Sequence, residues 1–117
     1  MLFGETISGL TIEKIKMEIR SIASANRDLA AIYGFGSFFR RMTYRDIDIL
    51  VVSTRECRNH LQVYYDFQQG AARIGSKIGV PIDITFLTAR EYRERPLLEM
   101  DTLTELYRRQ ANEYEEI

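Results

Sequence analysis

The stretch YGFGSFFRRMTYRDIDILVV, residues 33–52, carries the features that decide the fold. Its first residues complete a short apolar run, residues 30–35, which predicts a strand. The glycines that close this run predict a turn at Gly36 and Ser37. Its last residues, 46–52, are rich in β-branched side chains and bounded by charged segments, which predicts a second strand. The stretch therefore predicts two strands connected by a turn and a charged loop.

Helical spacing of apolar residues flanks this stretch on both sides. Upstream, the pattern from Thr11 onward predicts an amphipathic helix that ends near Asn26. Downstream, residues 56–78 predict a second helix, in which Gly70 and Gly75 are unfavourable. The apolar positions that fit this second helix are Leu61, Tyr64, Tyr65, Ala72 and Ile78.

The rest of the chain adds a third strand and further helix. Pro81 introduces residues 82–87, whose alternating composition predicts a strand, because proline is tolerated at a strand's first residue. Thr88 can cap a short helix, and the apolar residues after Pro96 predict a final helix. Those apolar residues are Leu97, Leu98, Leu103, Leu106 and Tyr107. Alternating helices and strands indicate an α/β or α+β fold.

The overall composition is that of one small domain. The chain has 117 residues, 45% of them hydrophobic, and can bury one ordinary core. We therefore expect a single domain over residues 1–117, with a core at about 11–88 and a C-terminal helical extension over 89–117. A formal net charge of -1 excludes the basic excess of a dedicated nucleic-acid coat, and the lone Cys57 excludes an internal disulfide and a cysteine-built zinc site.

We expect no membrane or export signal in this sequence. No apolar run approaches the roughly 20 residues of a membrane-spanning helix, and residues 1–10 carry Glu5 in place of a basic opening. A single cysteine also fits a reducing compartment. We therefore expect a cytoplasmic protein with no membrane partner.

Three aspartates are the candidate site residues. Side chains two apart in a strand point to the same side, so Asp46 and Asp48 form a pair while Ile47 and Ile49 face the opposite way. If the strand over 82–87 lies alongside, Asp83 completes a three-carboxylate cluster. In that register the apolar residues of the third strand, Ile82, Ile84 and Phe86, join the core.

Carboxylates held this close favour a metal site. They repel one another and raise their own pKa values unless cations sit between them. Mg²⁺ prefers hard oxygen ligands, and two such ions roughly 3.5 to 4 Å apart can support phosphoryl or nucleotidyl transfer. The simpler alternative is that Asp46, Asp48 and Asp83 are solvated charges at strand ends, since Asp-x-Asp alone also occurs by chance.

The turn before the aspartates favours a phosphate ligand. Gly36 lets the backbone approach a ligand closely, and Ser37 can begin a short helix through residues 38–42 whose N-H groups would attract phosphate. Gly-Ser by itself is a weak signal. Its combination with the aspartate pair favours a phosphate site beside a metal over solvated charges.

The order of these features resembles a known family. The chain resembles the minimal nucleotidyltransferase (MNT) family of the DNA polymerase beta superfamily in the order of its features. These are a strand, Gly36-Ser37, eight intervening residues, an Asp46-Ile47-Asp48 strand, a helix and an Asp83 strand. The resemblance implies an α+β fold with α/β-type layering, in which a small mixed β-sheet carries helices on one face.

The resemblance covers residues 12–86, and the chain departs from the family pattern at two points. The loop after Ser37 is a residue or two shorter than usual, and Arg41 stands where the family often has glycine. Neither departure removes one of the aspartates. The arginines of this loop, Arg40, Arg41 and Arg45, can contact phosphates or an RNA acceptor, or can form a solvated loop that screens the aspartates.

The resemblance also implies residue roles. Gly36 and Ser37 would bind the terminal phosphates, Asp46 and Asp48 would ligate both Mg²⁺ ions, and Asp83 would ligate the catalytic one, with Mn²⁺ as a substitute. An acceptor hydroxyl bound near Asp83 would attack the α-phosphate and release pyrophosphate.

The substrate implied is a nucleoside triphosphate, above all ATP, whose AMP passes to a hydroxyl of a protein, an RNA or a small molecule. Small members of the family often act beside a helical HEPN protein as its antitoxin, which implies a homo- or hetero-oligomer. The alternative is a non-catalytic module that binds nucleotide or caps a partner with the same fold.

Other residues rank below these. We expect His60 to be a surface residue and Cys57 to be a buried or idle thiol. Tyr64, Tyr65 and Phe67 are expected to be core or interface aromatics in preference to a base-stacking platform.

Overall fold

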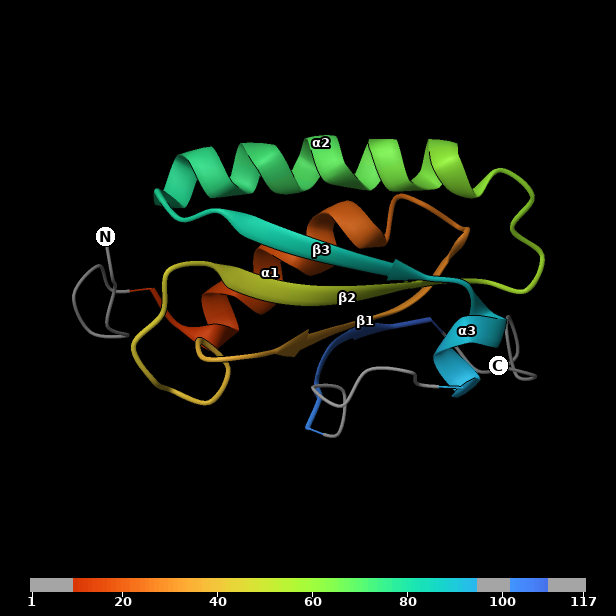
Figure 1. Ribbon diagram of the computed structural model, residues 1–117. Helices are drawn as coiled ribbons and strands as arrows, with labels where there is room; N and C mark the ends of the chain where they lie inside the picture. Colours follow the sequence, from red (N-terminus) through yellow and green to blue (C-terminus); the bar gives the residue numbers. More distant parts are fainter. Residues whose placement is uncertain (1–9, 95–101, 110–117) are drawn as a thin grey trace.

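The computed structural model describes residues 10–94 and 102–109. In these residues the elements, in chain order, are α1 (Ile12–Ala23), β1 (Leu29–Phe35), β2 (Ile47–Ser53), α2 (His60–Ile78), β3 (Ile82–Leu87), α3 (Ala89–Glu94) and β4 (Thr104–Arg108) (Figure 1). The strands form one sheet in the order β3-β2-β1-β4, with β2 and β3 parallel and the other pairs antiparallel. The predicted α+β class with a small mixed sheet is confirmed.

Side-chain caps set the ends of the two long helices. Thr11 Oγ1 accepts a hydrogen bond from Lys14 N at the start of α1, and Asn59 Oδ1 accepts one from Gln62 N at the start of α2. Gly79, with a left-handed φ of 78°, ends α2. No helix of the described residues combines the length and apolarity needed to cross a membrane.

Gly70, inside α2, has a packing role. A Cβ at Gly70 would lie 3.1 Å from Ile22 Cδ1 of α1, so the missing side chain permits a close approach of the two helices. This contact explains why α2 continues through Gly70 although glycine is unfavourable in a helix.

The main core lies between the sheet and the helices α1 and α2. Ile47, Ile49 and Val51 of β2 are fully buried in it. From α2 it receives Val63, Phe67, Ala71 and Ile74. Among the apolar positions that fitted the predicted helix, Leu61 and Tyr65 are 62% and 50% exposed, so they do not contribute to this core.

A smaller cluster covers part of the other sheet face. Tyr33 and Leu50 lie on this face, and Tyr92 of α3 stacks on Tyr33 with ring centroids 5.4 Å apart and an interplanar angle of 6°. Thr88 caps α3 as predicted: its Oγ1 accepts from Glu91 N at 3.1 Å, while Thr88 N donates to Glu91 Oε1 at 2.9 Å. Thus α1 and α2 share one face, and α3 packs on the opposite one.

The prediction of a final helix was wrong for residues 104–108. This segment is the strand β4, antiparallel to β1, and Leu106 is fully buried in the main core. Leu97 and Leu98 of the predicted helix lie outside the described residues. Pairing with β1 provides hydrogen-bond partners for the β4 backbone and buries Leu106. These tertiary interactions outweigh the local preference for a helix that the spacing of the leucines indicated.

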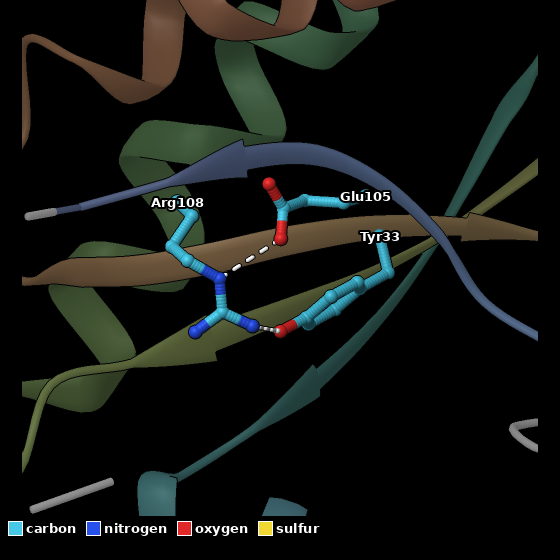
Figure 2. A network of polar contacts seen from close by, with 3 residues as sticks. All are labelled: Tyr33, Glu105 and Arg108. Carbon is cyan, nitrogen blue, oxygen red and sulfur yellow. Dashed lines mark hydrogen bonds and ion pairs between the residues drawn. The ribbon is translucent and has the colours of Figure 1, made fainter. Parts of the chain in front are cut away.

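Polar contacts hold β4 against β1. Arg108 donates hydrogen bonds to Tyr33 Oη at 2.7 Å and to Glu105 Oε1 at 2.8 Å, as Figure 2 shows. Burial of the Tyr33 ring raises the pKa of its phenol, so the hydroxyl stays protonated. Arg109 donates from Nε to Leu29 O and from a terminal nitrogen to Asn26 O, which fixes the connection from α1 to β1.

Candidate active site

The turn after β1 places Gly36 and Ser37 at the end of the sheet. Arg40 N donates to Gly36 O at 3.2 Å, and Met42 N donates to Ser37 O at 3.0 Å. The short helix predicted over residues 38–42 is absent. Arg41 has a φ of 60°, and a left-handed residue cannot continue a right-handed helix, so the segment is a hydrogen-bonded turn.

Gly36 lies directly against Asp48. Its φ is 81°, a conformation that side chains disfavour, and a Cβ added there would overlap Asp48 Oδ2. Glycine is therefore required at this position for two reasons, backbone conformation and contact. The turn therefore lies directly beside the Asp48 carboxylate.

The three aspartates converge as the alternation of β2 predicted. Asp48 of β2 is the register partner of Asp83 in β3, and Asp46 immediately precedes β2. Carboxylate oxygens of the three residues lie within 4.8 Å of one another. They lie on the sheet face opposite α1 and α2, because Ile47 and Ile49, which alternate with them, are buried in the main core.

Burial and mutual repulsion perturb this cluster. Partial burial, followed by the charges of Asp46 and Asp83, raises the pKa of Asp48 from 3.8 to about 6. Partial desolvation of the exposed Asp83 also raises its pKa, together with a hydrogen bond to Asp46 and the charge of Asp46. Clustered hard oxygen donors whose repulsion is relieved by positive charge fit a divalent cation.

The remaining sequence candidates lie elsewhere or are exposed. Arg40, Arg41 and Arg45 are exposed on the loop that leads to β2. His60 is exposed at the start of α2, where its Nδ1 is 3.3 Å from Ser53 Oγ, and Cys57 is buried, which raises the pKa of its thiol. Ser53 pairs with Leu29 at the end of the β1–β2 ladder opposite Asp48, so this group is separate from the aspartates.

Sequence reasoning did not identify a cavity of about 550 Å³ between α1 and α2. Its lining includes Leu29 and Asn59, which places it at the same end of the sheet as Ser53 and far from Asp48. Its lining residues come from two separate stretches of sequence, 21–29 and 59–73, and no short motif indicates such a site.

Comparison with known proteins identifies the fold. No family model matches the sequence, and no curated protein matches it. Among solved structures, a mutant of the toxin–antitoxin complex MntA-HpeT is 20% identical over 89% of this chain and 78% of that chain, with a TM-score of 0.54.

Two further structures agree. A protein from Sulfolobus solfataricus assigned as a nucleotidyltransferase is 23% identical over 83% of this chain and 79% of that chain, with a TM-score of 0.51. A toxin–antitoxin structure with AMP-PNP is 20% identical over 84% of this chain and 77% of that chain, with a TM-score of 0.54. The chain therefore shares the fold of these structures, which is the fold that the sequence resemblance implied.

Proposed function

We propose that this chain is a metal-dependent nucleotidyltransferase that transfers AMP from ATP to a hydroxyl group. The observation that carries the proposal is the convergence of Asp46, Asp48 and Asp83 beside the Gly36–Ser37 turn. A fold shared with nucleotidyltransferase structures supports it. A fold alone hosts many activities, so the argument rests on the site.

In this proposal Asp46, Asp48 and Asp83 hold two divalent ions, Mg²⁺ with Mn²⁺ as a substitute. When bound, such ions neutralise the charge that develops on the phosphates and make an acceptor hydroxyl more acidic. Gly36 and Ser37 bind the terminal phosphates: the glycine allows close approach, and the half-buried Ser37 supplies a hydroxyl donor.

The acceptor approaches from the β3 side in this proposal. Asp83 is exposed, and β3 is an edge strand of the sheet, so a hydroxyl of a second molecule has access there. Its oxygen forms a bond to the α-phosphorus while the bond to the β-phosphate bridging oxygen breaks. Pyrophosphate leaves, and the hydroxyl proton passes to solvent.

We infer that the acceptor is a partner protein of the helical HEPN class, with this chain as its antitoxin. Similar structures are toxin–antitoxin complexes, one of them with AMP-PNP, and the exposed site suits an acceptor that brings its own binding surface. Transfer to RNA or to a small-molecule hydroxyl would instead appear as labelled nucleic acid or a labelled soluble product.

The test follows two labels of ATP in the presence of Mg²⁺. Label in the α-phosphate should reach the acceptor and label in the γ-phosphate should leave as pyrophosphate, whereas phosphoryl transfer would give the reverse.

Asp48→Asn should lower transfer at least 100-fold, and Asp66→Asn on the exposed surface of α2 is the matched control. Equal labelling by wild type and Asp48→Asn would refute the catalytic proposal. Tight Mg²⁺-dependent AMP-PNP binding without any transfer would favour the non-catalytic module.

A further inference from the structure

An aromatic cluster lies beneath the Gly36–Ser37 turn. We call Phe38, Phe39 and Tyr44 the aromatic anchor; their exposed fractions are 2%, 8% and 2%. Phe38 meets Phe39 and Tyr44 edge to face, with ring centroids 5.0 and 4.8 Å apart. Buried aromatics in a loop that also carries three exposed arginines show that the loop packs on the core at this point.

Phe39 occupies the position that a side chain of Gly34 would take. A Cβ at Gly34 would overlap the ring of Phe39, so the ring rests directly on the β1 backbone. Gly34 pairs with Ile49, whose side chain is buried in the main core together with Phe39. The contact is therefore on the helix-covered face of the sheet.

The turn is thus held on both faces of β1. On the open face Gly36 abuts Asp48, and two residues earlier Gly34 receives the Phe39 ring on the opposite face. Between these two contacts, Arg40 N closes the turn by donating to both Gly36 O and Ser37 O at 3.2 Å. The path of the backbone from residue 36 to residue 40 is fixed at both ends by packing.

We propose that Phe39 is a positioning residue. Its ring packs on Gly34, and this contact holds Gly36 and Ser37 beside Asp48. The inference rests on the proposed function, in which the Gly36–Ser37 turn binds polyphosphate and Asp48 holds a metal ion. Both groups then have to stay at a fixed distance from each other. Polar groups that must act together need support that holds them within about 0.5 Å. Phe39 acts through the turn and touches no substrate.

A matched pair of variants tests this proposal. Phe39→Leu and Phe67→Leu each shorten a buried phenylalanine of the same core, and Phe67 lies in α2 beside the cavity, away from the turn. Hydrogen exchange of the Arg40 and Met42 amides reports the turn itself, and the affinity for Mg²⁺ with AMP-PNP reports its use. Circular dichroism melts verify that both variants are folded and comparably destabilised.

The two readouts separate the positioning role from the proposed function. Phe39→Leu should speed exchange of the turn amides at least 10-fold and weaken AMP-PNP binding at least 5-fold, while Phe67→Leu changes both less than 2-fold. Unchanged turn exchange in Phe39→Leu, or equal effects of the two variants, would overturn the proposal. Failure of the wild type to bind AMP-PNP would refute the proposed function, and the exchange rates would still decide whether Phe39 holds the turn.

Discussion

Asp48 is the residue on which the site converges. Its carboxylate contacts Gly36 of the turn, lies in register with Asp83 and is near Asp46. Partial desolvation and two like charges explain why its pKa rises to about 6. The closeness of the three carboxylates destabilises their ionised form without a metal. For the same reason it favours the binding of a cation.

The raised pKa of Asp48 predicts a pH dependence of stability. Because the folded-state value of about 6 exceeds the ordinary 3.8, the stabilising contribution is fully present below pH 3.8 and is lost as the pH rises through 6. The metal-free free energy of unfolding should fall by roughly 1 kcal/mol from pH 4 to pH 7, after allowance for solvent screening. Urea denaturation across this range measures the fall. Asp48→Asn should flatten the profile, and an equally steep profile in that variant would contradict the assignment.

Substitution of Gly36 separates backbone strain from contact with Asp48. Gly36 and Gly79 have nearly equal φ values, 81° and 78°, but only a Cβ at Gly36 meets a neighbour within 4 Å. Gly36→Ala should therefore destabilise the protein by about 1 to 3 kcal/mol more than Gly79→Ala and weaken Mg²⁺ binding. Denaturant unfolding and metal titration provide the two measurements. Equal losses in the two variants would show that the contact with Asp48 has no energetic role.

At the level of elements, the edge strand β4 depends on long-range contacts. Its backbone pairs with β1, Leu106 enters the core, and Arg108 and Arg109 bond to residues more than 70 positions earlier. None of these contacts is local, so the helical spacing of leucines in this segment could not reveal the strand.

Arg109 provides a test of how β4 is held. Its guanidinium donates at 2.8 Å to Leu29 O and at 2.7 Å to Asn26 O, a fork that a lysine ammonium cannot reproduce. Arg109→Lys should lower the free energy of unfolding by about 1 to 2 kcal/mol, measured in urea. Arg90→Lys, on the exposed face of α3, is the charge-conserving control and should change stability by less than about 0.5 kcal/mol. Equal effects would show that the fork does not secure the strand.

At the scale of the whole molecule, the site joins β2, β3 and the turn that follows β1, so ligand binding should stabilise these elements together. Mg²⁺ with AMP-PNP at 100 times its Kd should add about 2.7 kcal/mol, a rise of several degrees in Tm. Thermal melts with Mg²⁺ alone, with AMP-PNP alone and with both measure the effect. Asp83→Asn should lose the joint shift and retain the fold, whereas an undiminished shift would place the ligand elsewhere.

The sequence by itself determined what depends on short-range pattern. The period of two placed Asp46 and Asp48 on one side of a strand, and Thr11 and Thr88 marked helix starts. The order of these features also implied the fold that structural comparison confirmed. The alternation and the helix caps need no tertiary context, because each involves neighbours within about four residues.

Only the tertiary structure decided which distant surfaces meet. The parallel pairing of β3 with β2 brings Asp83 beside Asp48, and burial of Leu106 converts a helical pattern into a strand. The residues after Ser37 form a packed turn where a short helix was expected, with the Phe39 ring against Gly34 and a left-handed Arg41. Each outcome depends on surfaces formed by segments far apart in the chain, whose packing energy exceeds the local conformational preferences.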